Sequence, residues 1–192
     1  MNYLLDCGTH FFQGLNKLND IYRFDHTWQI YCFEANPITF IKSKKYYPSF
    51  PNIIHENLAV SINENECIVN CDINNNDECG QGSNILTSPP NKDIVYNHLF
   101  NFMPYKVKKF DICKFLQQLN NIEQLIIKID IEGEEFNVVP HILKHFNCSL
   151  INTIYIEFHE RFFIEEIETY QKLKIKYKES LSKLGCRVIE WE

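Results

Sequence analysis

The stretch Tyr3-Leu4-Leu5-Asp6-Cys7-Gly8 decides the fold class. It is a short apolar run that stops at a glycine, and the segment 13–24 that follows carries apolar residues at helical spacing. The order strand, turn, helix is therefore predicted at the start of the chain. A glycine at the end of such a strand allows backbone to approach a ligand that any side chain would exclude.

The same unit recurs along the chain. Apolar runs predict further strands at 28–33, 52–60, 125–131, 151–158 and 186–191, and apolar periodicity predicts helices at 37–45, 111–119, 134–145 and 165–184. Strands that alternate with helices predict an α/β fold with a mostly parallel sheet and helices on both faces. The polar, Asn-rich segment from about 61 to 110 predicts an inserted hairpin or long loop. No linker or repeat divides the chain, so we expect one domain over residues 1–192.

Composition narrows the class further. With 45% hydrophobic and 23% charged residues, the chain is typical of a globular protein. The net charge of -6 disfavours a long nucleic acid as partner, because that affinity rests on clustered Lys and Arg. The sequence shows neither an apolar run of about 20 residues nor a signal-peptide pattern, so we expect a cytoplasmic protein without membrane contact. The eight cysteines are then expected as reduced thiols, and Cys67, Cys71 and Cys79 lack the spacing of structural zinc ligands.

Residues that follow each predicted strand are the candidates for binding, because parallel sheets bind ligands beyond the carboxyl ends of their strands. Asp6 and Gly8 follow the first strand. Glu34 follows the second, where a carboxylate can accept both hydroxyl protons of a ribose. Each feature alone is more often an ordinary turn or a solvated side chain. Together they predict an adenosine-binding edge.

A second group of candidates is Lys128, Asp130 and Glu132. Strand alternation predicts that all three point to one side, at the ligand edge of the sheet. Three charges on an apolar strand need a reason, since an unpaired buried charge is costly. One interpretation is an ion pair of Lys128 with a carboxylate, while Glu134 and Glu135 complement the next helix N-terminus. The interpretation that we favour is a role in catalysis or substrate binding.

The next strand ends in Ile156-Glu157-Phe158-His159. His159 can serve as a general base, because an imidazole titrates near neutral pH. A hydrogen-bonded packing role is an equal alternative for a histidine in this place. The segment 80–84, Gly-Gln-Gly-Ser-Asn, predicts a turn, and a mobile loop over the site is the second interpretation.

These segments, in this order, resemble the FkbM-type family of S-adenosylmethionine-dependent methyltransferases. The similarity spans nearly the whole chain. It is most specific for Phe33-Glu34-Ala35-Asn36-Pro37 combined with Lys128-Ile129-Asp130-Ile131-Glu132-Gly133-Glu134-Glu135. The resemblance implies a Rossmann-like class I methyltransferase fold and methyl transfer from S-adenosylmethionine to an oxygen, commonly of a sugar or related small molecule.

The resemblance also implies roles for individual residues. The cofactor-binding set that it implies is Asp6, Gly8, Thr9, His10, Glu34, Ala35, Asn57, Leu58 and Asp130. The candidate catalytic residues are Lys128, Asp130, Glu132 and His159. The protein mainly has to align the acceptor and receive its proton, for which Asp130 or His159 would suffice. A divalent cation held by Asp130 and Glu132 is a second way to acidify an acceptor hydroxyl.

One feature departs from the family pattern. The family usually has another glycine shortly after the first, where this chain has Phe11 and Phe12, and the next glycine is Gly14. We therefore expect bulk at this place to crowd the cofactor or the acceptor.

Three alternatives stay open. A nicotinamide-dependent oxidoreductase needs the turn G-x-G-x-x-G, which the first turn lacks. A catalytically degenerate cofactor-binding module or partner subunit is favoured by Phe11 and Phe12, whereas the presence of both Asp130 and Glu132 is evidence against it. An RNA ribose 2′-O-methyltransferase needs a basic stripe, and only the lysines of 106–109 cluster. We expect a small-molecule or glycan acceptor, and a homodimer is compatible with the sequence.

Overall fold

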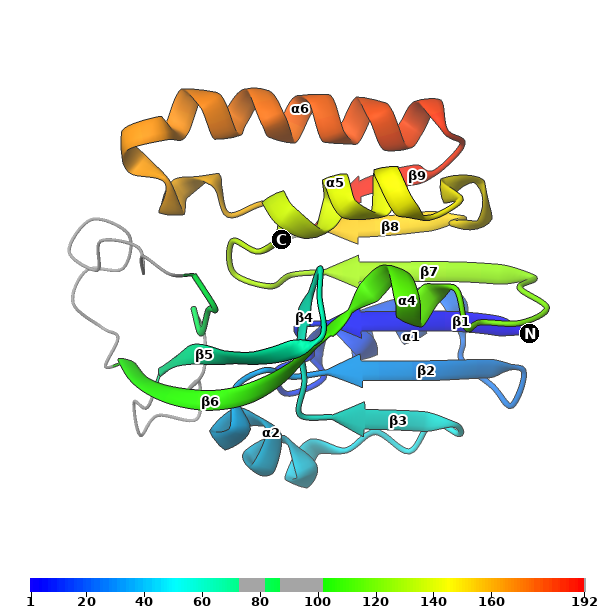
Figure 1. Ribbon diagram of the computed structural model, residues 1–192. Helices are drawn as coiled ribbons and strands as arrows, with labels where there is room; N and C mark the ends of the chain where they lie inside the picture. The colour runs from blue at the N-terminus through cyan, green and yellow to red at the C-terminus, as the bar shows by residue number, and fades with distance from the viewer. Residues whose placement is uncertain (73–81, 87–101, 192) are drawn as a thin grey trace.

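A six-stranded parallel sheet forms the centre of the computed structural model, which describes residues 1–72, 82–86 and 102–191 (Figure 1). The strand order is β3-β2-β1-β7-β8-β9. The strands are β1 (Asn2–Cys7), β2 (Trp28–Phe33), β3 (Ile53–Glu56), β7 (Gln124–Ile129), β8 (Thr153–Ile156) and β9 (Arg187–Glu190). Each neighbouring pair runs parallel. The predicted α/β architecture is confirmed.

Helices cover both faces of this sheet. The helices are α1 (Gln13–Tyr22), α2 (Pro37–Ser43), α4 (Ile112–Leu116), α5 (Glu135–His145) and α6 (Ile167–Lys183). Alternate residues of β1 enter different cores: Leu4 packs with Leu15 and Leu18 of α1, whereas Leu5 packs in the core under α5. In Figure 1, α4, α5 and α6 lie on the opposite side of the sheet from α1. Short 3-10 turns lie at Lys44–Tyr46, Cys148–Leu150, Glu160–Phe162 and Ile164–Glu166.

The predicted insertion forms a second, small sheet. It contains β4 (Ala59–Ser61), β5 (Asn65–Asp72) and β6 (Phe102–Asp111) in the order β4-β6-β5, with β5 antiparallel to β6. The single strand predicted over 52–60 is therefore wrong. Asn57 forms a corner there, and β4 leaves the main sheet to pair with β6. Residues 73–81 and 87–101, and with them Cys79, lie outside the described part.

The ends of the helices follow local rules. The Asp111 carboxylate accepts hydrogen bonds from the backbone N–H groups of Cys113 and Lys114, so it caps α4 as predicted, although α4 ends at Leu116. Gly185, with φ 93°, follows α6 as the predicted stop. No helix among the described residues has the length and apolar composition to cross a bilayer.

The boundary between β1 and β7 positions the site. Strands are added on both sides of it in opposite directions, which makes it the switch point where doubly wound sheets bind ligands. Asp6 pairs with Lys128 in the register, so the loops that follow these two strands leave the sheet side by side. Gly8 begins the first loop with φ 84°. A Cβ added there would lie 1.8 Å from the carbonyl oxygen of Asp130, so only glycine fits.

Candidate active site

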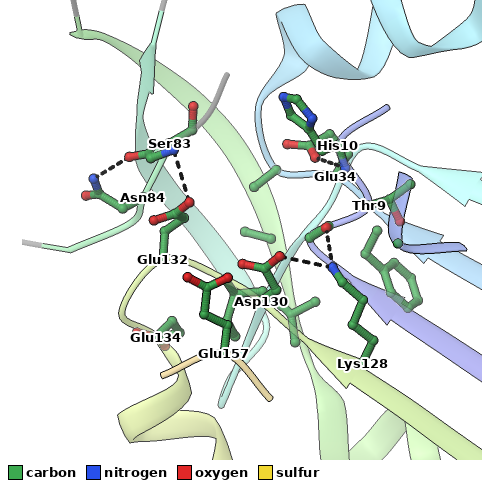
Figure 2. Close-up of a pocket in the computed structure, with 18 of the residues that line it drawn as sticks. Thr9, His10, Glu34, Ser83, Asn84, Lys128, Asp130, Glu132, Glu134 and Glu157 are labelled. Atoms are coloured by element: carbon green, nitrogen blue, oxygen red, sulfur yellow. Dashed lines mark hydrogen bonds and ion pairs between the residues drawn. The ribbon is translucent and has the colours of Figure 1, made fainter. Parts of the chain in front are cut away.

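A cavity of about 420 Å³ lies at this switch point (Figure 2). Its volume is in the range of small-ligand sites. Most of the candidate residues line it: Gly8, Thr9, His10, Glu34, Ala35, Leu58, Lys128, Asp130 and Glu132. Figure 2 shows Glu34 and His10 on one side and Glu132 and Glu157 on the other, with Asp130 between them. The candidates Asp6, Asn57 and His159 do not line the cavity.

Asp6 and Lys128 form a buried ion pair beside the cavity. The Lys128 ammonium lies 3.2 Å from Asp6 Oδ1 and 3.2 Å from Asp130 Oδ2, and it donates to the Gly8 carbonyl oxygen at 2.9 Å. These three partners match the three N–H groups of an ammonium. Burial lowers the pKa of Lys128, but the Asp130 and Asp6 carboxylates outweigh burial and hold this pKa above its usual value. Asp6 therefore acts on the cavity through Lys128, which fixes Gly8 and Asp130.

Phe11 and Phe12 turn away from the cavity. Phe12 is fully buried and stacks edge-on against the rings of Tyr47 and His55, and its φ of 64° allows this turn. Neither phenylalanine lines the cavity, so the expected crowding does not occur. Gly14 lines the cavity instead. A Cβ added there would lie 2.9 Å from Lys128 Cε, so the glycine leaves room for the buried lysine.

Glu34 joins the loops that follow β1 and β2. Its Oε2 accepts a hydrogen bond from the backbone N–H of His10 at 2.8 Å, and its Oε1 accepts one from the backbone N–H of Asn36 at 2.8 Å. The side chain is nearly buried, and burial raises its pKa. Two backbone donors thus hold a carboxylate at the edge of the cavity.

Asn57 supports this edge from behind. Its side-chain amide donates to the carbonyl oxygens of Glu34 at 2.7 Å and Ala35 at 3.0 Å. Leu58, the next residue, faces the cavity. Asn57 and Leu58 were both predicted to bind the cofactor. In the structure Asn57 holds the loop after β2, whereas Leu58 lines the cavity.

Asp130 and Glu132 both line the cavity, as predicted, although neither lies on a strand and they contact different partners. β7 ends one residue before Asp130, and Glu132 has a φ of 55°, so the alternation stops there. Asp130 contacts Lys128, whereas Glu132 accepts a hydrogen bond from the Gly82 backbone N–H at 3.0 Å and lies 3.1 Å from His159 Nε2. Burial raises the pKa of Glu132 to about 7. This value is close to that of an effective general base at neutral pH.

His159 is enclosed by carboxylates. Its Nδ1 lies 3.1 Å from Glu135 Oε1, and its Nε2 faces Glu132, with Glu157 at 3.4 Å and Asp130 at 3.9 Å. Burial lowers the pKa of His159, but the carboxylates of Glu135 and Glu132 outweigh burial and raise it to about 10. The ring therefore carries a proton at neutral pH, which favours a charged, orienting role over that of a general base.

A family model described as the methyltransferase FkbM domain matches residues 6–178. The chain belongs to this family. No curated protein and no solved structure matches the chain. The matched span of the FkbM methyltransferase domain contains every candidate residue named from the sequence. The central sheet and its flanking helices are the Rossmann-like fold expected for this family.

The FkbM domain also offers a set of ligands for a metal ion at this site. Asp130, Glu132 and His159 each present one ligand atom, and these atoms lie within 4.8 Å of one another. A second such group among the described residues contains Asp111 and His141, but Asp111 is already the cap of α4.

Sequence reasoning missed several residues that line the cavity of this FkbM domain: Gln13, Gly14, Lys17, Ile85, Glu157, Arg161 and Trp191. Glu157 directly follows β8, so its place after a strand was a usable signal. Trp191 follows β9, and its ring lies 5.7 Å from the Lys128 ammonium, a contact across the sheet that no local pattern reveals. Ser83 accepts a hydrogen bond from the Asn36 side chain at 3.0 Å, which places the segment 82–86 against the cavity.

Proposed function

We propose that the protein is an S-adenosylmethionine-dependent O-methyltransferase that acts on a hydroxyl of a sugar, glycan or related small molecule. The observation that carries the proposal is one cavity at the switch point with a backbone-held carboxylate, Glu34, at one end, Glu132 at the other and Asp130 between them. Membership of the FkbM family supports methyl transfer in general. The cofactor and the oxygen acceptor are the added claims.

The residues at the first end fit S-adenosylmethionine. Gly8 lets the loop after β1 pack closely against the Asp130 backbone at the edge of the cavity, and Glu34 supplies the carboxylate that a ribose diol needs. Ala35 and Leu58 would flank the adenine. When bound, the cofactor supplies a methyl group on a sulfonium centre, which is already a good leaving group.

The chain's own groups then have to orient the acceptor and take its proton. Glu132 is the group best suited to accept the proton, because it lines the cavity and its pKa is about 7. The Glu132 carboxylate would take the hydroxyl proton of the acceptor, while the bound cofactor would supply the methyl group and leave as its thioether. The Lys128 ammonium contacts Asp130, so the second carboxylate is held in a fixed orientation beside Glu132.

A divalent cation is a second form of the proposal. Asp130, Glu132 and His159 are close enough together to share one ion, which would lower the pKa of an acceptor hydroxyl bound to it. Titration with Mn²⁺ and assays in EDTA separate the two forms. Full turnover in EDTA supports the metal-free form.

The acceptor end of the cavity favours a hydroxyl-rich small molecule. Ser83, Asn84, Glu157 and Arg161 line it and offer hydrogen-bonding groups of both kinds. The lysine cluster that an RNA acceptor would need is less available, since Lys106 forms an ion pair with Glu66. These observations support a sugar-type acceptor over an RNA ribose.

Calorimetry with S-adenosylmethionine and S-adenosylhomocysteine tests the cofactor. We expect micromolar binding by the wild type and its loss in Glu34→Ala. Glu56→Ala is the matched control, because Glu56 ends the neighbouring strand β3 but does not line the cavity. Absence of binding by the wild type would overturn the proposal.

A radiolabelled methyl group and a panel of methyl glycosides test the acceptor. Transfer to a glycoside hydroxyl supports the proposal. Cofactor binding without transfer to any hydroxyl acceptor would favour the degenerate module.

A further inference from the structure

Two buried residues that do not line the cavity, Glu135 and His159, support the residues that do. We propose that Glu135 is a positioning residue for methyl transfer, which acts through His159 to hold the Glu132 carboxylate at the cavity. The catalytic meaning of this arrangement rests on the proposed function.

Glu135 fixes the turn that carries the acidic residues. Its Oε1 accepts a hydrogen bond from the Ile131 backbone N–H at 2.8 Å, and its Oε2 accepts one from the Gly133 backbone N–H at 2.9 Å. The turn needs such support, since Glu132 and Gly133 have φ values of 55° and 104°. A non-glycine residue in the left-handed region costs free energy that surrounding contacts must offset. Glu135 makes two of these contacts from a position with no solvent exposure.

His159 connects Glu135 to the cavity, because its ring contacts Glu135 on one side and Glu132 on the other. Because Nδ1 lies 3.1 Å from Glu135 Oε1, the ring orientation is fixed and Nε2 faces Glu132 at 3.1 Å. The same Nε2 lies 3.9 Å from Asp130 Oδ1, so one ring contacts both carboxylates of the acidic turn. A ring that is free to rotate would release Glu132 from this place.

The neighbouring carboxylates do other work. Glu134 accepts hydrogen bonds from Ser61 and Asn137, which tie α5 to β4. Glu160, next to His159 in sequence, pairs with Lys174 of α6 at 3.2 Å. Glu135, His159 and Glu132 thus form a separate series of side-chain contacts. It runs from the interior of the protein to the cavity.

The test uses variants of the first two residues in this series of contacts, Glu135 and His159. Glu135→Gln keeps the size of the side chain but replaces one acceptor oxygen by an amide. His159→Asn keeps a donor near the position of Nδ1 and removes Nε2. The measurements are the Kd of S-adenosylhomocysteine by calorimetry and kcat with a methyl glycoside that the wild type methylates.

We expect the Kd to stay within about twofold of the wild type, and kcat to fall about 10- to 100-fold in each variant, as for other residues that orient a reacting group. The double variant should lose no more than the larger single loss, because both residues act as one unit. An unchanged kcat in either variant, or losses that multiply in the double variant, would overturn the proposal.

Glu160→Gln is the matched control, and its kcat should equal that of the wild type. If Glu135→Gln does not fold, His159→Asn tests the same series of contacts, and His159→Gln, which keeps a donor near Nε2, should then restore part of kcat. A wild type that does not bind S-adenosylhomocysteine contradicts the proposed function. A wild type that binds and turns over, with variants that do the same at full rate, contradicts the positioning role alone.

Discussion

The two ends of the cavity are built in different ways. At the proposed cofactor end, defined by Gly8, Glu34 and Leu58, the carboxylate is held by backbone N–H groups of the loops on either side. At the proposed acceptor end, defined by Glu132 and Glu157, carboxylates gather around one buried histidine, and these side-chain contacts add to the hydrogen bond that Glu132 accepts from the Gly82 backbone N–H. The first end depends on the path of the backbone. The geometry of the second end depends on the balance of charge between these carboxylates and the histidine.

The largest effect that separates these ends is expected for Gly8→Ala. The new Cβ would overlap the Asp130 carbonyl oxygen at 1.8 Å, so we expect a loss of at least about 4 kcal/mol in unfolding free energy, or no folded protein. Gly14→Ala is the matched comparison, because its Cβ would meet the Lys128 side chain rather than backbone. It should cost about 1 kcal/mol. Urea denaturation measures both, and equal losses would contradict a backbone origin for the cofactor end.

The next effect is expected at the ion pair that lies between the two ends. Lys128→Met leaves the buried Asp6 carboxylate without its cation, which should cost about 3 kcal/mol of unfolding free energy. Adding Asp6→Leu should restore most of the stability, because a well-packed apolar pair can replace a buried ion pair. Methyl transfer should stay lost in the double variant, since Gly8 and Asp130 lose their anchor. A double variant less stable than Lys128→Met would contradict this account.

The pH dependence of stability should have opposite signs at two histidines, His55 and His159. Burial, together with the charge of Lys44, lowers the pKa of His55 to about 4, so the unfolded state binds more protons between pH 4 and 6.5. Stability should therefore fall as the pH drops through this range, by about 1 kcal/mol after allowance for partial exposure. The pKa of His159 is raised to about 10, so its contribution is complete below pH 6.5 and is lost as the pH rises through 10.

Thermal unfolding in EDTA from pH 4 to 10 checks both signs. His55→Phe should flatten only the acid side of the stability profile, and His159→Asn only the alkaline side. If His55→Phe changes the alkaline side of the stability profile, or His159→Asn changes the acid side, the two histidines do not control separate pH ranges.

The smallest effect is expected for Asn57→Ala. The Asn57 amide binds the carbonyl oxygens of Glu34 and Ala35 without lining the cavity. Its loss should cost about 1 kcal/mol of stability and weaken S-adenosylhomocysteine binding several-fold, through the loop rather than through a lost contact. Calorimetry with S-adenosylhomocysteine and urea denaturation measure the two effects. A total loss of binding would place Asn57 in direct contact with the ligand.

The same contrast explains what the sequence could predict. Gly8 and Glu34 stand at the ends of apolar strands, so the parallel sheet and the cofactor end followed from local patterns. The task of Glu135 did not, because its partner His159 is 24 residues away and the contact arises only from packing. The orientation of the Phe12 side chain also could not be predicted from the sequence. The left-handed backbone conformation of Phe12 turns the ring into the core under α1. The large side chain therefore packs in the core and does not crowd the cavity.

Trp191 has a consequence for how the protein folds. The cavity has one wall from the loop and helix at residues 8–17 and another from Trp191, whose backbone N–H donates to Ile156 at 2.9 Å. Contacts between such distant positions raise the contact order, and the entropy of closing the intervening chain has to be met before they form. A partly folded chain can therefore hold β1, β2 and β3 together and still lack a binding site. Ligand affinity should appear as one of the last events of refolding, after most of the helical signal has returned.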